Sequence, residues 1–368
     1  MSFRAYSGLV ALIFILILAS FSISSATVLQ TPSDGAKQPS VVHDGQHDFD
    51  FDLGTWKTHS SRLLHPLTGS TTWADMDGIT VVKKVWGGRA NLAEYKADGS
   101  AGHVELLSLR WYNPSARQWY LDFATPNVGI LGIPGVGEFK NGRGDFYDQE
   151  EINGKYILIR FSIWSISADK AQSEQAFSDD GGKTWEVNWV NKYTRLSDAV
   201  EIDWDTQPSD AQQPGQHDFD FNTGIWHTQI KRTLDPLSTS SGSMELSGTV
   251  SVRKVWGGRA RLEEIEADGP NGHWEGLSLF LYNPQSHQWS QSFINSKQGI
   301  LNAPLIGVFK DGRGELLSPD TFKERAILVR GVWSEITPNS HRYDEFYSDD
   351  GGQTWKASFQ ANLTREKQ

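Results

Sequence analysis

Two arginines occupy positions in this sequence where a charged side chain could carry chemistry. Arg160 lies in the segment YILIRFSIW, where the alternate positions are Leu158, Ser162 and Trp164, and Arg330 lies in the corresponding segment AILVRGVWS. A charge on an otherwise apolar strand face is costly to bury unless it meets a carboxylate or an anionic ligand. We therefore predict that Arg160 and Arg330 either bind a ligand or pair with an internal carboxylate.

Glu94 and Glu264 are the candidate partners of these arginines, because they share strand parity with Leu92 and Leu262. A buried Glu and Arg could orient a ligand, act as general acid and base, or form a plain internal salt bridge. If the chain is an enzyme, Glu94 and Glu264 are its predicted catalytic residues. The tryptophans predicted to line the same ligand site are Trp86, Trp256, Trp164 and Trp333.

Several other kinds of site are disfavoured by the residues present. The chain has no cysteine, which excludes thiolate metal sites, Cys nucleophiles and disulfides. His103 and His273 each precede a glutamate by two residues, but no third metal ligand has readable spacing, so we predict no metal. The histidines of the two GQHDFDF segments are interpreted as part of a polar lead-in. We find no nucleophile elbow and no phosphate loop, and we predict no cofactor.

The charge balance argues against a nucleic-acid partner. The chain carries 45 acidic and 34 basic residues, a formal net charge of −11, and it has no basic run. Binding to nucleic acid or to an anionic membrane by electrostatics needs a basic surface.

The first 26 residues are predicted to be an export signal. Arg4 is followed by an apolar stretch, residues 9–19, and by small residues with Ser24 and Ala26 at cleavage-site spacing. An uncleaved anchor is the alternative, but the stretch is short for a span of about 20 apolar residues. We expect a periplasmic or secreted protein that has no membrane contact after cleavage.

The rest of the chain is an internal duplication of one sequence unit. GQHDFDF begins at Gly45 and again at Gly215, and KVWGGRA begins at Lys84 and again at Lys254, a displacement of 170 residues in both cases. We predict a flexible leader over 27–44, a first domain over 45–197, a linker over 198–214 and a second domain over 215–368. Two long copies do not make a solenoid or a propeller, so each copy should be a complete domain.

Within each copy the apolar residues alternate with period 2. Leu107, Leu109 and Trp111 are one example, and Asn-, Asp-, Pro- and Gly-rich turns such as KNGRG separate the runs. We predict an all-β fold of two tandem antiparallel barrels with about eight to ten strands each.

The start and end of each copy resemble lipocalin-like (calycin) barrels. FDFDLGTW and FDFNTGIW match the Gly-x-Trp first strand of that superfamily, and NKYTR and ANLTR match its arginine on the last strand. More narrowly, the pattern is similar to an uncharacterised bacterial family labelled domain of unknown function 1579. The resemblance implies that an arginine lies over a tryptophan and closes each barrel, Arg195 over Trp56 and Arg365 over Trp226. Haem-binding nitrobindins of this superfamily use a histidine near the end of the barrel. The comparable residues 171–195 contain no histidine, and the second copy has His341 slightly earlier, without a counterpart in the first copy.

The segments SDDGGKTW and SDDGGQTW match the Asp-box of sialidases letter for letter. A sialidase also needs an arginine triad and a tyrosine nucleophile assembled across a propeller, which two barrels cannot supply. We therefore assign the motif a structural role in a hairpin turn. The residues that carry this role are Asp180, Trp185, Asp350 and Trp355.

We expect an exported binding protein that holds a small, largely apolar ligand in one or both barrels. The ligand could bear a carboxylate that meets Arg160 or Arg330. Two alternatives remain open: an isomerase-, cyclase- or hydratase-type enzyme on the same barrel, and a non-catalytic module that presents a surface to a partner.

Overall fold

The computed structural model describes residues 44–100, 102–200, 204 and 213–367. The predicted signal segment, the leader before Asp44 and most of the linker lie outside these described residues. From Asp44 onward the chain forms one compact unit that holds both copies. Within the described part of the chain, no helix has the length and apolar character needed to span a membrane.

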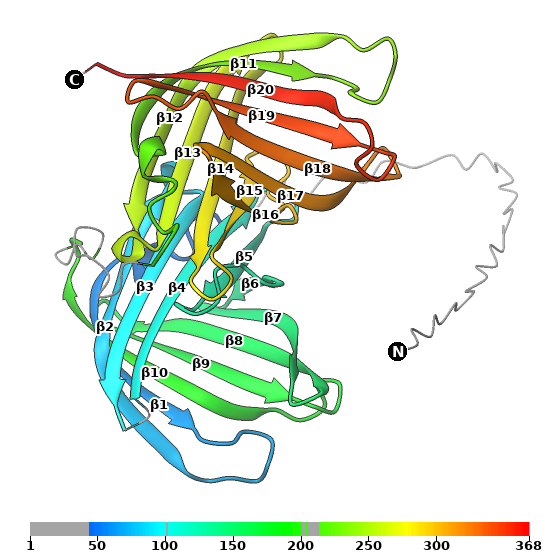
Figure 1. Ribbon diagram of the computed structural model, residues 1–368. Helices are drawn as coiled ribbons and strands as arrows, with labels where there is room; N and C mark the ends of the chain where they lie inside the picture. Colours follow the sequence, from blue (N-terminus) through cyan, green and yellow to red (C-terminus); the bar gives the residue numbers. More distant parts are fainter. Residues whose placement is uncertain (1–43, 101, 201–203, 205–212, 368) are drawn as a thin grey trace, which may run out of the picture. The chain divides into compact units, whose positions relative to one another are not determined.

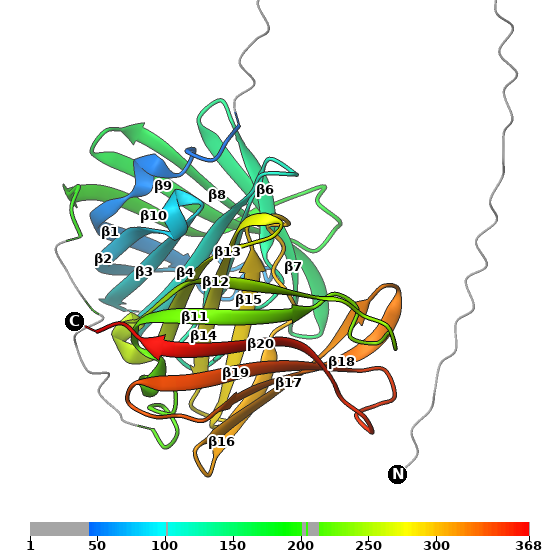
Figure 2. The same ribbon diagram turned by 90° about the horizontal axis from the view of Figure 1, so that it is seen from above.

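The first copy folds into a closed antiparallel barrel, barrel 1 (Figures 1 and 2). Each strand pairs with the next along the chain, and β1 also pairs with β10, which closes the ring. Its strands are β1 (Gly54–Leu63), β2 (Trp73–Val85), β3 (Ala90–Gly99), β4 (Gly102–Asn113), β5 (Gln118–Ala124), β6 (Gly135–Lys140), β7 (Arg143–Ile152), β8 (Lys155–Ser167), β9 (Lys170–Ser178) and β10 (Glu186–Ser197).

The second copy repeats this topology as barrel 2, with β11 pairing both β12 and β20. The prediction of two tandem antiparallel barrels is confirmed, with ten strands in each ring. The strands are β11 (Gly224–Thr233), β12 (Ser243–Val255), β13 (Ala260–Gly269), β14 (Gly272–Asn283), β15 (Gln288–Asn295), β16 (Leu305–Lys310), β17 (Arg313–Phe322), β18 (Arg325–Ser334), β19 (Ser340–Ser348) and β20 (Lys356–Arg365).

A short 3-10 turn precedes the first strand of each barrel and brings a phenylalanine into its closed end. These turns are η1 (Asp50–Asp52) and η4 (Asp220–Asn222). Phe49 is 1% exposed and packs edge-on against Trp119, with 4.9 Å between ring centroids. Phe219 makes the same contact with Trp289 at 5.0 Å. The aromatic-rich lead-in thus becomes the floor of each lumen.

The Gly-x-Trp signature has a steric basis in the first strand. Gly54 has φ +117°, and a Cβ there would lie 2.5 Å from the carbonyl oxygen of Ser197. Only glycine fits this conformation and this approach of β10. The Arg195 guanidinium lies 4.0 Å from the centroid of the Trp56 ring and donates to the carbonyls of Leu53 and Phe51.

Barrel 2 repeats this closure with Arg365 and Trp226, also at 4.0 Å. Arg365 donates to the carbonyls of Thr223 and Phe221. In both barrels the last strand is therefore hydrogen-bonded to the segment that leads into the first strand.

Candidate ligand-binding site

Arg160 and Arg330 lie on the outer faces of their barrels. On β8 the inward face carries Ile159, Phe161 and Ile163, of which Phe161 and Ile163 pack with the aromatic floor. Arg160, on the alternate face, stacks on Trp185 at 4.6 Å. Arg330 stacks on Trp355 at 4.3 Å. A partly exposed cation over an indole ring accounts for both arginines without an internal carboxylate or a ligand.

Glu94 and Glu264 also project from the outer faces of their barrels. The Glu94 carboxylate lies 3.5 Å from the Lys83 ammonium, and the Glu264 carboxylate lies 2.9 Å from the Arg253 guanidinium. Leu92 and Leu262 share these faces, as the strand parity predicts, but the faces do not line a lumen. The structure therefore does not bring the predicted Glu and Arg together.

Trp86 and Trp256 lie in a hydrophobic cluster that joins the outer faces of β3 and β4 to those of β13 and β14. Each begins a 3-10 turn, η2 (Trp86–Gly88) or η5 (Trp256–Gly258), and each is at most 3% exposed. The buried cluster comprises Val85, Trp86, Ala90, Leu92, Leu107, Leu109, Trp111, Ala124, Leu131, Val255, Trp256, Ala260, Leu262, Leu277, Leu279, Leu281 and Ile294. These two tryptophans thus hold the copies together and do not line a lumen.

Two ion pairs related by the 170-residue repeat cross the same contact. Arg89 pairs with Glu275, and its counterpart Arg259 pairs with Glu105. Because each copy contributes the same two side chains, the contact is self-complementary, like that of a two-fold dimer.

Trp164 and Trp333 lie on opposite faces of equivalent strands. Trp333 is 2% exposed and packs in the floor of barrel 2 beside Phe219, whereas Trp164 stacks under Arg143 on the outer face of barrel 1. The register explains this difference, because Gly144 pairs with Ile163 and Gly314 pairs with Trp333. The true counterpart of Trp333 is therefore Ile163.

The two SDDGG turns are built around their second aspartate. Asp180 accepts hydrogen bonds from the hydroxyl of Ser178, the amide of Lys183, and the amide and hydroxyl of Thr184. The bonds from Thr184 are the main cause that lowers the pKa of Asp180 to about 2. Asp350 accepts equivalent bonds from Ser348 and Thr354, and its pKa is lowered further.

The histidine pairs singled out by the sequence form local contacts at exposed positions. His103 contacts Asp98 at 2.8 Å and Glu105 at 3.2 Å, and His47 contacts Asp50 at 3.0 Å. Within the described ranges, no group of three His, Asp or Glu side chains is placed to hold a metal ion.

A buried ion pair occupies the closed end of the barrel 1 lumen. Arg110 on β4 donates to Asp52 at 2.5 Å, and the two side chains are 6% and 3% exposed. Burial raises the pKa of Asp52, and the Arg110 guanidinium opposes that shift. Arg110 also lies 5.0 Å from the centroid of the Phe49 ring. Arg110 lies on the face of β4 opposite Leu109 and Trp111, and no signal in the sequence indicates that this face is the inward one, because Leu109 and Trp111 pack against the other copy.

The closed end of barrel 2 uses different residues at the same places. Asn222 and Phe280 replace Asp52 and Arg110. Glu263 on β13 accepts from Ser278 at 2.9 Å and from Asn222 at 3.3 Å, and burial raises its pKa.

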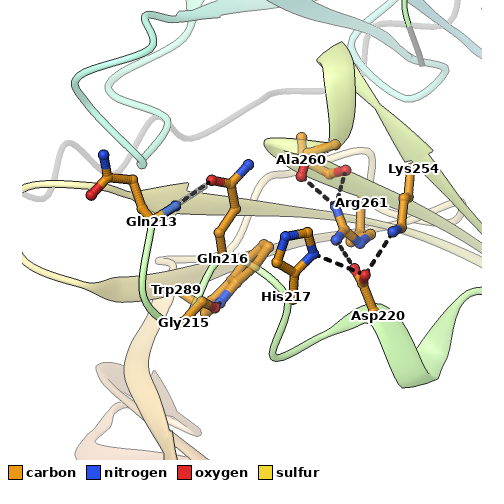
Figure 3. A network of polar contacts seen from close by, with 10 residues as sticks. Gln213, Gly215, Gln216, His217, Asp220, Lys254, Ala260, Arg261 and Trp289 are labelled. Carbon is orange, nitrogen blue, oxygen red and sulfur yellow. Dashed lines mark hydrogen bonds and ion pairs between the residues drawn. The ribbon is translucent and has the colours of Figure 1, made fainter. Parts of the chain in front are cut away.

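The buried arginine of barrel 2 comes from β13 instead of β14. Arg261 is 1% exposed and donates to Asp220 and to the carbonyls of Gly258 and Ala260. Figure 3 shows Lys254 and His217 converging on the same Asp220 carboxylate, at 2.7 and 3.0 Å. Because Arg261 and Lys254 share the Asp220 carboxylate, this network ties η4 to β12 and β13.

The open half of the barrel 1 lumen combines aromatic and amide side chains. Phe123 faces inward, with its ring centroid 5.6 Å from that of Phe161, yet it remains 36% exposed. Gln175 and Asn191 face the same space and are partly accessible to solvent. Gln175 donates to Asn188 at 3.0 Å. An inward aromatic ring with this exposure shows that solvent reaches the lumen wall.

Asp148 is the carboxyl group in this wall that the sequence did not identify. It shares the inward face of β7 with Phe146, and a Cβ on Gly135 would lie 3.5 Å from its Oδ2. Burial, followed by the nearby Glu150 and Asp122, raises the pKa of Asp148 to about 7. Its parity, two residues after a core phenylalanine, was the available signal.

The open half of the barrel 2 lumen is richer in aromatic rings. Tyr343, Glu345 and Phe359 face inward from β19 and β20 and are partly accessible. Gly331 stands where barrel 1 has Phe161, and a Cβ there would lie 2.9 Å from the Tyr343 hydroxyl. Tyr343 therefore fills the space that Phe161 occupies in barrel 1.

Comparison with known proteins supplies no family for this chain. No family model matches it, and no curated protein matches it. The solved structures that resemble it include the following three, all at low identity. S-type phycobiliprotein lyase CPES from Guillardia theta is 10% identical, with TM-score 0.30, over 43% of this chain and 99% of that chain. EF1p2_mFAP2b bound to DFHBI is 10% identical, with TM-score 0.25, over 41% of this chain and 99% of that chain.

The third similar structure is a protein of unknown function from the DUF3598 family of Nostoc punctiforme. It is 11% identical, with TM-score 0.23, over 88% of this chain and 99% of that chain. Because these scores are low, the barrel architecture rests on the strand pairing within this chain.

Proposed function

We propose that this protein is an exported binding protein that holds a small, largely apolar ligand in the lumen of one or both barrels. The observation that carries the proposal is the accessible inward face of the open half, above all Phe123, which is 36% exposed although it points into barrel 1. Below it the lumen is closed by a packed aromatic floor. Such a wall suits a ligand with an apolar body and a few polar groups.

The structure changes the expected polar contact of the ligand. Arg160 and Arg330 are stacked on outer tryptophans, so a ligand carboxylate has no support from them. In barrel 1 the available polar groups are amides and the carboxyl group of Asp148. Export and membership of the family labelled domain of unknown function 1579 stay parts of the proposal that rest on the sequence.

The test is saturable binding of the apolar fluorophore N-phenyl-1-naphthylamine, with stoichiometry from native mass spectrometry. Gln175→Trp should abolish binding in barrel 1, because it fills the lumen. Gln172→Trp is the matched control, since Gln172 lies on the same strand but on the outer face. Binding that is unsaturable, or that is lost equally in both variants, would refute the proposal.

A second candidate is an isomerase-, cyclase- or hydratase-type enzyme in barrel 1. Asp148 favours it, because a carboxyl group in an accessible lumen with a pKa of about 7 can exchange a proton near neutral pH. In this candidate function Asp148, and not Glu94 or Glu264, is the general acid or base. Deuterium incorporation next to the carbonyl of cyclohexanone, followed by NMR, would detect proton abstraction. The same rate with wild type and with Asp148→Asn would remove this candidate.

A further inference from the structure

Glu345 is an inward-facing carboxyl group in the lumen of barrel 2. It faces inward from β19, two residues after Tyr343, and it is partly accessible to solvent. Its Oε1 accepts a hydrogen bond from the Ser358 hydroxyl at 3.0 Å. Burial raises its pKa, and the Ser358 hydrogen bond and the Arg232 charge oppose that shift.

Aromatic rings on several strands face the same lumen as this carboxyl group, and Phe359 is its cross-strand neighbour. The Tyr343 ring lies 4.7 Å from that of Trp333 and 6.2 Å from that of Phe359. Farther round the lumen, Trp274 and Phe293 stack at 6.1 Å between centroids. The faces of such rings attract cations, which they bind more strongly when the site is desolvated.

Two buried polar groups in this lumen are free to accept hydrogen bonds. Gln291 Oε1 and Thr228 Oγ1 have no hydrogen-bond partner among the residues that the structure describes. Gln291 is 7% exposed and Thr228 is 1% exposed. An amide oxygen only accepts, and a hydroxyl can accept as well as donate. A ligand that donates N–H groups would complement both.

Charged and titratable groups on other strands act on Glu345. Arg232 on β11 is attractive and Asp320 on β17 is repulsive, and Glu263 adds a further carboxyl group deeper in the barrel. Burial, followed by the Arg365 charge, lowers the pKa of His341 to about 3, so the imidazole is neutral. The tyrosines at 343 and 347 have raised pKa values and are neutral as well.

We propose that the lumen of barrel 2 binds an organic cation, an amine joined to an apolar or aromatic body, with its ammonium group beside Glu345 and its body against the rings. This inference rests on the proposed function, which it makes specific for one barrel. Barrel 1 has Gln175 and Ser173 at the positions of Glu345 and Tyr343, so its lumen lacks this combination.

The test is calorimetric titration of the full chain with three probes that differ mainly in charge: 2-phenylethylamine, 2-phenylethanol and phenylacetate. We expect the amine to bind at least tenfold more tightly than the alcohol and phenylacetate to bind weakest. Glu345→Gln should weaken amine binding by about tenfold or more, which is about 1.4 kcal/mol, because it removes the negative charge beside the ammonium group. Alcohol binding should stay within about threefold. Amine affinity of wild type should rise as the pH passes through the raised pKa of Glu345, and that dependence should vanish in Glu345→Gln.

The first copy offers a gain-of-function control. Gln175→Glu places a carboxylate at the equivalent position of barrel 1 and should increase amine affinity there, giving a second site. An alcohol that binds as tightly as the amine, or a Glu345→Gln variant with unchanged amine affinity, would overturn this inference and leave the proposed function standing. Absence of binding by all three probes, together with the lack of saturable N-phenyl-1-naphthylamine binding, would overturn both.

Discussion

The buried pair of Asp52 and Arg110 gives a quantitative prediction, because barrel 2 shows what can replace it. Both side chains are at most 6% exposed, and their closest atoms are 2.5 Å apart. Removing one partner leaves the other charge buried and unpaired, which costs about 3–5 kcal/mol. We therefore expect Asp52→Asn and Arg110→Phe each to destabilise barrel 1 by that amount.

The double variant Asp52→Asn/Arg110→Phe copies the pair found in barrel 2, Asn222 and Phe280. Replacing both partners of a buried ion pair is often neutral or stabilising. The double variant should therefore lie within about 1.5 kcal/mol of wild type, with a coupling energy of several kcal/mol. Urea unfolding followed by tryptophan fluorescence measures all four proteins. Single variants that cost less than about 1 kcal/mol would refute the argument, because they would show that water screens the pair.

Three further predictions concern other parts of the molecule. Asp148→Asn should stabilise the protein by on the order of 2–4 kcal/mol at pH 8 and by little at pH 4. The pKa of Asp148 is raised from 3.8 to about 7 in the folded state, so its contribution to stability is fully present below pH 3.8 and is lost as the pH rises to about 7. Equal shifts of the urea midpoint at both pH values would contradict this. Arg195→Ala should cost about 2–4 kcal/mol through the lost stacking on Trp56 and the lost carbonyl bonds, measured by thermal unfolding. Glu105→Arg should destabilise the contact with Arg259, and adding Arg259→Glu should restore the melting temperature; no recovery would argue against that ion pair.

Strand alternation and the repeat were sufficient to predict the two barrels, and the paired Arg and Trp at each end followed from the family resemblance. The face on which a residue lies was predicted less well. Glu94 shares a face with Leu92, and that face is apolar because it packs against the other copy. On β3 and β4 both faces are buried, so burial alone could not distinguish the lumen from the contact between the copies. The inward carboxyl groups Asp148 and Glu345 were missed because each lies among polar neighbours in the sequence.

The two copies differ most inside the barrels, and this pattern bears on their function. The arginines and glutamates of the contact between the copies are the same in both, as are the arginine and tryptophan that close each barrel. The lumens instead exchange Gln175 for Glu345 and Asp148 for Ser318 at equivalent positions. Gln175 and Glu345 are partly accessible and do not pack in the apolar floor, so packing does not explain the exchange of an amide for a carboxyl group. The retained residues therefore maintain one scaffold, and the exchanged residues give its two lumens different charge and hydrogen-bonding capacity. If both lumens bind ligands, 2-phenylethylamine should therefore prefer barrel 2, and equal affinity of this amine for both lumens would be inconsistent with the divergence.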